Sequence, residues 1–174
     1  MMFWIVSCGW AEQWIESWFS DFENESFKMK IPSVWEVIED KDTILPKARA
    51  WEIELAVTST NFNTGFANNM LILSDDLDSL TTAKDYSMLN NVWASSDYID
   101  YKKLATKNVV FADWTESVLY EFEAKYNKDT PLLKFIQTAN ICNTNKAYFI
   151  TVALNTNIED ITRYEDFITS FECK

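Results

Sequence analysis

Hydrophobic and polar residues alternate with a period of two in many segments of this chain, and this pattern is the strongest constraint on its fold. The segment 27–32 puts Phe27, Met29 and Ile31 on one side and polar residues on the other, which predicts a half-buried strand. Similar patterns predict further strands at residues 33–40, 51–60, 69–77, 106–112, 116–126, 131–142 and 146–154. The last two strands form a hairpin, and its turn at 143–145 contains asparagines, which tolerate positive φ.

One segment between these strands changes to the period of an α-helix. Residues 81–93 place Tyr86, Leu89 and Trp93 on one helical face. Thr82 stands three residues before an acidic residue, which is the spacing of a capping box. We therefore expect a helix that packs against the sheet.

The chain closes with a second helical pattern, at residues 157–171, which Thr156 and Glu159 begin as a capping box. Its apolar stripe consists of Ile158, Ile161, Tyr164, Ile168 and Phe171. Antiparallel strands interrupted by one helix and closed by another indicate an α+β fold. We expect an antiparallel β-sheet sandwiched by helices.

The composition argues against several classes of function. The net charge is −12, and the 15 lysines and arginines are scattered, which argues against a nucleic-acid partner. There is no histidine for a Ser-His or Cys-His pair, and two glycines cannot form a P-loop or a GxGxxG motif. We therefore predict a protein that is not an enzyme and has no cofactor.

A run of aspartates is the candidate site for a divalent cation. Asp75, Asp76 and Asp78 follow a predicted strand, and carboxylate oxygens are ligands for hard cations. Asp97 and Asp100 follow the first helix and offer a further carboxylate pair. Such runs are more often solvated loops, and this one lacks the Gly and terminal Glu of an EF-hand loop. The alternative function that they suggest is a cation-dependent binding module or hydrolase.

The first residues resemble an export signal. Ile5-Val6-Ser7-Cys8 is similar to a bacterial lipobox, in which a signal peptidase cuts before the cysteine and the thiol is lipidated. Residues 9–26 contain five carboxylates and no Lys or Arg, as expected of a solvated spacer. We expect a signal-peptide remnant at 1–8, an acidic tether at 9–25 and the domain at 26–174. The alternative is an apolar N-terminal segment that docks on the domain.

The three cysteines, Cys8, Cys142 and Cys173, have no CxxC spacing, and without histidine they argue against a zinc site. Cys142 and Cys173 can form a disulfide if the domain lies outside the cytoplasm. Two separate thiols are the favoured interpretation, because spacing alone does not define the pairing.

The order of the predicted elements and several anchor residues resemble the PsbP/Mog1-like family. Its first strand ends in a proline followed shortly by Trp, here Phe27, Pro32 and Trp35. Its last strand contains Tyr, here Tyr148, and leads into a terminal helix that ends in Ser-Phe, here at Phe171. The resemblance covers about residues 25–173. It implies an antiparallel sheet sandwiched by helices and a role in binding or scaffolding. The resemblance assigns no ligand-binding residue in this chain, because the matched positions are core anchors.

Tryptophan is abundant and glycine is scarce, with eight and two residues respectively. Average usage would give roughly twelve glycines. Five tryptophans stand where a linker or a turn favours glycine, namely Trp10, Trp14, Trp18, Trp93 and Trp114. One hypothesis is that several of these are UGA codons read as glycine in the natural host. The other is an amphipathic tryptophan helix at residues 10–19 that lies at a membrane interface.

These inferences together favour a bacterial, non-enzymatic, extracytoplasmic domain. It is expected to be attached to the membrane only through a lipid on Cys8 and to bind a protein whose identity the sequence does not define. A cytosolic protein-binding adaptor with an unmodified Cys8 is the further alternative.

Overall fold

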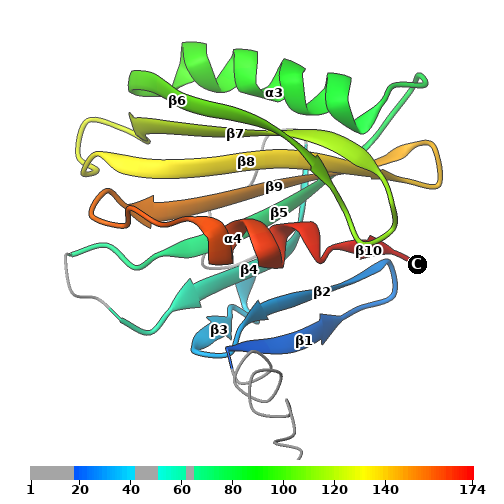
Figure 1. The fold of residues 1–174 in the computed structure, drawn as a ribbon, viewed down its shortest axis with the longest axis horizontal. Coiled ribbons are helices and arrows are strands. Elements are labelled where there is room, and N and C mark those ends of the chain that lie inside the picture. The colour runs from blue at the N-terminus through cyan, green and yellow to red at the C-terminus, as the bar shows by residue number, and fades with distance from the viewer. Residues whose placement is uncertain (1–17, 42–50, 62–64) are drawn as a thin grey trace, which may run out of the picture.

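The computed structural model of this chain describes residues 18–41, 51–61 and 65–174. A seven-stranded antiparallel sheet forms its centre. Helix α3 (Ala83–Asp97) covers one face of that sheet. Helix α4 (Thr162–Thr169) and a three-stranded sheet cover the other face (Figure 1). The predicted α+β class, an antiparallel sheet sandwiched by helices, is confirmed.

The large sheet has the strand order β3-β4-β5-β9-β8-β7-β6, and neighbouring strands are antiparallel. Its strands are β3 (Trp35–Val37), β4 (Glu52–Ser59), β5 (Asn69–Asp76), β6 (Ile99–Val110), β7 (Glu116–Lys125), β8 (Leu133–Cys142) and β9 (Lys146–Asn155). In the small sheet, β2 (Phe27–Pro32) lies between β1 (Phe19–Glu23) and β10 (Glu172–Cys173).

The alternation of the sequence divides each central strand between the two faces of the large sheet. On β9, Tyr148 and Ile150 belong to the cluster under α4, whereas Ala147 and Phe149 belong to a cluster on the α3 side. Side chains of a strand point to opposite faces at successive residues, so a strand covered on both faces is buried along nearly its whole length. This arrangement explains why most of β8 and β9 is buried.

Several predicted strands have other limits. The predicted strand 33–40 is reduced to β3, and β2 forms a second sheet with β1 and β10 instead of extending the large one. The predicted strand 106–112 begins earlier, at Ile99, and ends at Val110. Its first half was missed because Asp100 has a φ of 56° and two register shifts interrupt the alternation.

The predicted tether ends earlier than residue 25, because its residues 19–23 form β1. This strand pairs along its whole length with β2, from Phe19 opposite Pro32 to Glu23 opposite Lys28. The sequence does not alternate here, because the two partly buried residues of the strand, Phe19 and Phe22, are three positions apart. Residues 1–17 lie outside the described residues, so the signal-peptide remnant and the rest of the tether stay predictions.

Helix α3 begins as predicted, because Thr82 caps it and accepts a hydrogen bond from the Asp85 backbone N–H. It continues beyond the predicted end, through Asp97. The predicted apolar face is wrong in part: Tyr86 is buried, but Leu89 and Trp93 are exposed. The buried face contains polar side chains instead, which hydrogen-bond to the sheet or within the helix.

Helix α4 is shorter than predicted, because the capping box of Thr156 and Glu159 does not form. The chain turns at residues 156–157, and the helix begins at Thr162. Asp160 accepts a hydrogen bond from the Thr162 backbone N–H and so satisfies one of the free donors at the start of the helix. Phe171 lies beyond the helix end but is fully buried, as its predicted packing role requires.

Cys142 and Cys173 form a disulfide, so the interpretation as two separate thiols is wrong. Their Cα atoms lie 5.6 Å apart, within the usual range for a disulfide. The pairing depends on β10, which returns from α4 to lie beside β2 and brings Cys173 to the end of β8. No local pattern in the sequence indicates that the chain returns to lie beside β2.

Two tryptophans of the glycine hypothesis occupy very different backbone conformations. Trp114 has a φ of 68° in the β6–β7 turn and its side chain is 85% exposed. The Trp114 N–H donates to the Phe111 carbonyl oxygen and closes a tight turn. Trp114 takes the left-handed backbone conformation there, whereas Asp113 does not, so this is not the turn with two positive φ values that favours Asp-Gly. Trp93 lies in the interior of α3 and not after its end, and glycine is unfavourable in a helix interior.

The β8–β9 turn has positive φ at Asn143, as expected, and also at Thr144.

Candidate functional site

A cleft of about 310 Å³ lies where the β2–β3 corner meets α4. Its volume is at the lower end of the range for small-ligand sites. Its lining includes Trp18, Pro32, Trp35, Arg163, Tyr164 and Phe167. Segments far apart in sequence therefore build one aromatic wall around a single guanidinium group.

Trp35 is nearly buried at the side of this cleft. Its ring centroid lies 6.1 Å from that of Tyr164 and 5.8 Å from that of Phe167. Tyr164 and Phe167 are three residues apart on α4, so they lie on the same helical face. Strand β3 fixes Trp35 because it pairs with Ser59 of β4. The aromatic wall is thus held by both the large sheet and α4.

Arg163 provides the positive charge of the cleft. Its guanidinium lies 4.0 Å from the centre of the Trp18 ring, within the range of a cation–π interaction. Thr162 hydrogen-bonds to Asp160 and lowers the pKa of that carboxyl group, and the Arg163 charge lowers it further. Burial raises the pKa of the Tyr164 hydroxyl above its ordinary value, at which the group is already neutral near pH 7. The cleft offers apolar surface, one cation and a neutral hydroxyl, a combination suited to recognition.

Three of the predicted anchor residues form the aromatic centre of the core. Phe27 stacks on Phe171 at 4.8 Å between ring centroids, and Tyr148 lies 5.4 Å from Phe27 and 5.3 Å from Phe171. All three are buried. The other two anchors, Pro32 and Trp35, line the cleft.

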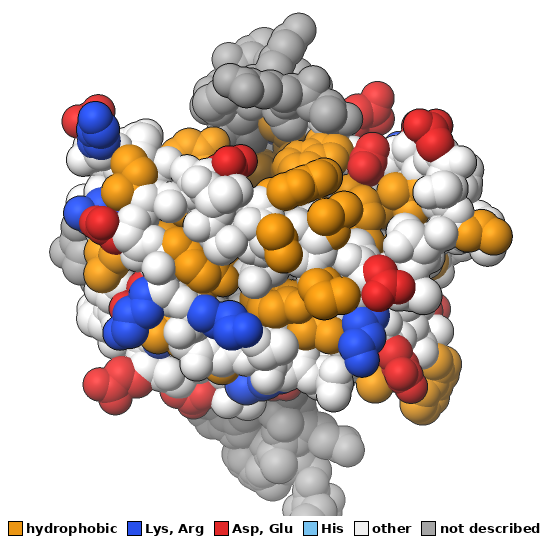
Figure 2. Space-filling model, turned by 90° about the horizontal axis from the view of Figure 1, so that it is seen from above, with side chains coloured by type: hydrophobic (Ala, Val, Ile, Leu, Met, Phe, Trp, Pro, Cys, Tyr) orange, Lys and Arg blue, Asp and Glu red, His pale blue; other side chains and the backbone are white. Residues whose placement is uncertain are grey.

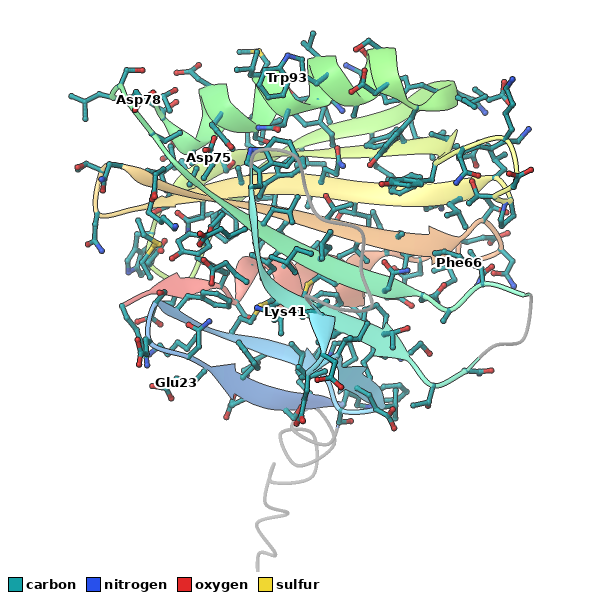
Figure 3. All side chains as sticks on the ribbon, turned by 180° about the vertical axis from the view of Figure 1, so that it is seen from behind. Glu23, Lys41, Phe66, Asp75, Asp78 and Trp93 are labelled. Atoms are coloured by element: carbon teal, nitrogen blue, oxygen red, sulfur yellow. A yellow bond between two sulfur atoms is a disulfide. The ribbon has the colours of Figure 1, made fainter. Side chains whose placement is uncertain are left out.

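The structure does not bring the three predicted aspartates together. Asp75 accepts a hydrogen bond of 2.9 Å from the Tyr86 hydroxyl. Burial raises the pKa of Tyr86, and this hydrogen bond raises it further. Asp76 forms an ion pair of 3.2 Å with Lys146. Asp78 is exposed in the segment that leads to α3 (Figure 3).

Within the described ranges, no three acidic or cysteine side chains are placed to share an ion. The further carboxylate pair is also separated by its contacts. Asp97 is exposed at the end of α3, and Asp100 forms an ion pair of 2.8 Å with Lys125. Cation binding by the aspartate run therefore stays a prediction without a converging ligand set among these residues.

Asp113 holds the end of the chain against the sheet, a role that was not predicted. One of its oxygens accepts a hydrogen bond from the Thr115 N–H, and the other accepts from the Asn140 amide and the Cys173 N–H. Burial raises the pKa of Asp113, but these hydrogen bonds outweigh it and leave the pKa below its usual value. The sequence signalled only a turn at this position, because Asn140 and Cys173 are distant in sequence.

The predicted lipid-attachment residue, Cys8, lies outside the described residues. Among the residues that the structure does describe, neither helix has the length and apolar content needed to cross a membrane.

No protein-family model matches the chain, and no curated protein sequence matches it. Among solved structures, it is similar to cyanobacterial PsbP (CyanoP) from Synechocystis sp. PCC 6803, with a TM-score of 0.61 and 13% identity. That match covers 97% of this chain and 98% of the other. A structure from Bacteroides thetaiotaomicron has a TM-score of 0.48 and 11% identity over 85% of this chain and 45% of the other. The chain therefore has a PsbP-like fold, as its anchor residues predicted.

Proposed function

We propose that this chain is a non-enzymatic binding domain of the PsbP-like family, held outside the cytoplasm by a lipid on Cys8. The PsbP-like fold is consistent with a binding or scaffolding role. The observation that carries the proposal is the aromatic cleft between β3 and α4. Its rings and guanidinium are groups that recognise a partner, whereas the chain has no histidine to act as a general base there.

The cleft is suited to an apolar side chain of a partner protein with a carboxylate beside it. Trp, Tyr and Arg are the residues most enriched among those that dominate protein–protein affinity. Trp35 and Tyr164 provide rigid apolar surface, and the carboxylate would lie next to Arg163. The exposed Val34 at the rim gives access for a probe.

The disulfide supports a location outside the cytoplasm. Disulfides form and persist in oxidising compartments and are rare in the reducing cytoplasm. Cys142 and Cys173 join the end of β8 to the last strand of the chain. This support is independent of the lipobox-like sequence that ends at Cys8.

Photo-crosslinking tests the cleft. A photoreactive residue in place of Val34 is expected to crosslink to a discrete cell-envelope protein, and Arg163→Glu is expected to reduce the yield severalfold. The matched control is the same photoreactive residue at Val110, which is also exposed but belongs neither to the cleft nor to the segments around α3. Equal crosslinking at both positions, or no effect of Arg163→Glu, would remove the cleft from the proposal.

Metabolic labelling with a fatty acid tests the anchor. Label is expected on the natural protein in its own host and is expected to disappear in the Cys8→Ala variant. An unlabelled protein in the soluble fraction would instead support the cytosolic adaptor with an unmodified Cys8.

Calcium and manganese titration tests the alternative cation-dependent function. Because Asp75, Asp76 and Asp78 do not converge, the melting temperature is expected to stay unchanged. A rise of several degrees that Asp76→Ala abolishes would replace the proposed function with the cation-dependent one.

A further inference from the structure

Helix α3 differs from an ordinary surface helix, whose apolar stripe faces the core, because half of its buried residues are polar and apolar residues lie outside. Its buried positions include Ser87, Asn90 and Asn91. Its outer side carries an uninterrupted apolar strip, which we call the α3 ridge. The ridge consists of Met88, Leu89, Val92 and Trp93, whose exposed fractions are between 46% and 58%.

Hydrogen bonds on the inner side fix this orientation of the helix. The Ser87 hydroxyl donates to the Val118 carbonyl oxygen at 2.6 Å, and the Asn91 amide donates to the Tyr101 hydroxyl at 3.0 Å. Turning the ridge inward would break these bonds and leave buried polar groups without partners, at about 1–3 kcal/mol each. The apolar side chains therefore remain outward in the folded domain.

The ridge is part of a larger apolar surface. Trp93 stacks beside Trp51 at 6.5 Å between ring centroids, and Trp51 lies 6.1 Å from Phe149 on the sheet. Figure 2, which looks down on the molecule from the α3 side, shows hydrophobic side chains gathered along the middle of this face. A contiguous exposed patch of this kind marks an interaction site more often than scattered apolar residues do.

Acidic residues flank the ridge at both ends. Residues 75–100, which include α3 and the segments on either side, contain six aspartates and one lysine. Asp85 lies in the first turn of the helix, Asp97 lies at its end, and Asp78 lies in the segment before it. Asp76 and Asp100 are paired with Lys146 and Lys125, so these two aspartates add little to the net charge of this surface. Lys102 of β6 is paired with Glu123, whereas Lys84 and Lys103 keep their charge and offset only part of that of the other four aspartates. The flanks therefore favour a positively charged partner.

The position of α3 argues for a protein partner instead of a lipid surface. Helix α3 and strand β1, where the described chain begins, lie at opposite ends of the molecule (Figure 1). The aspartates would also be repelled by anionic headgroups, whereas membrane-surface helices favour Lys and Arg.

We propose that the α3 ridge binds a cationic amphipathic helix of a partner protein. Apolar side chains of that helix cover Leu89, Val92 and Trp93, and its Lys and Arg residues lie against the flanking aspartates. Recognition of this kind, a helix laid on an apolar surface, uses anchors three and four residues apart on the bound helix. The proposal does not depend on the aromatic cleft, and only the argument from the position of α3 rests on the proposed Cys8 anchor.

The probe is a synthetic leucine–lysine peptide of about five helical turns, or about 18 residues. Its control has the same composition in an order that forms no apolar face. The full chain is expected to bind the amphipathic peptide and to bind the scrambled one at least about tenfold more weakly. Asp85→Asn is expected to weaken binding about twofold to fivefold, the effect of one exposed charge pair.

Val92→Glu separates apolar contact from simple charge attraction. The added carboxylate strengthens binding of a cationic peptide if attraction is only electrostatic, but it weakens binding at least about tenfold if the ridge is the contact. Val110→Glu adds the same charge at an exposed valine outside both the ridge and the aromatic cleft and is expected to change nothing. Leu89→Ser gives a second ridge variant, and thermal unfolding shows that each variant is folded.

Three results would overturn the proposal. Tighter binding by Val92→Glu would reduce the interaction to net charge. Equal binding of both peptides would remove the requirement for a helix. Self-association of the chain alone in sedimentation experiments, abolished by Val92→Glu, would identify a second copy as the occupant of the ridge.

Discussion

The two faces of the seven-stranded sheet use the same strands but are packed by different chemistry. On the α4 side, Phe27, Tyr148, Phe171 and their neighbours form one continuous apolar cluster that also includes the small sheet. On the α3 side, two smaller clusters are accompanied by polar contacts such as that of Ser87. The α4 side also carries the disulfide cysteine of β8. Stability is therefore expected to reside mainly on the α4 side, which leaves the outer side of α3 free for binding.

The largest expected difference is in the loss of stability when an aromatic residue of the α4 side or an apolar residue of the α3 ridge is replaced by alanine. Phe171→Ala removes a fully buried ring and should lower the free energy of unfolding by about 3–5 kcal/mol. Leu89→Ala should change it by no more than about 0.5 kcal/mol, because Leu89 is exposed. Denaturant unfolding measures both. Similar losses would contradict the asymmetry of the two faces.

Removal of the disulfide is the next largest effect. The Cys142→Ala and Cys173→Ala double variant should lose about 3 kcal/mol, because the cross-link that restricts the unfolded chain is absent. Reduction of the unmodified protein should give a comparable fall in melting temperature. Cys8→Ala serves as the matched control and should leave the melting temperature unchanged. Free thiols at both positions in non-reducing peptide mapping of the natural protein would refute the pairing.

Two serines of α3 test the polar side of the comparison. Ser87→Ala leaves the Val118 carbonyl without its side-chain donor and should lower the free energy of unfolding by about 1 kcal/mol. Ser95→Ala changes an exposed serine of the same helix and should be neutral or slightly stabilising, since alanine favours helix. Equal effects of the two substitutions would mean that the inner polar contacts do not hold α3.

Replacing either of two tryptophans by glycine should change the stability in opposite directions. Trp114→Gly should raise the free energy of unfolding by about 1 kcal/mol, because glycine adopts the left-handed backbone without steric cost. Trp93→Gly should lower it by about 1 kcal/mol, because glycine is unfavourable inside a helix.

Tandem mass spectrometry of the natural protein tests the codon hypothesis directly. The hypothesis predicts glycine at position 114, and tryptophan there would refute it for this position.

The smallest expected effect is the pH dependence that Asp113 contributes. Its pKa is lowered in the folded state, so its stabilisation is complete above the unfolded pKa of about 4 and is lost as the pH falls through the lower folded value. The stability difference between the unmodified chain and Asp113→Asn should therefore be constant from pH 7 to about 5 and shrink below pH 4. A difference that grows on acidification would contradict the lowered pKa.

Local pattern determined the elements whose signal lies within a few residues. The alternation around Phe27 predicted β2, the apolar segments around the 143–145 turn predicted β8 and β9, and the Thr82 cap predicted the start of α3. The resemblance of the anchors correctly led to a PsbP-like fold. These features were predictable because side-chain period and capping are set by neighbouring residues along the chain.

The tertiary structure alone decided which distant groups meet. It paired Cys142 with Cys173, gathered Trp35 and Arg163 at one cleft, and gave Asp113 its partners. It also turned the polar side of α3 inward, against the usual rule for helical stripes, because sheet groups accept and donate hydrogen bonds there. Long-range contacts depend on how strands and helices are assembled in space, and no local period of the sequence contains that information.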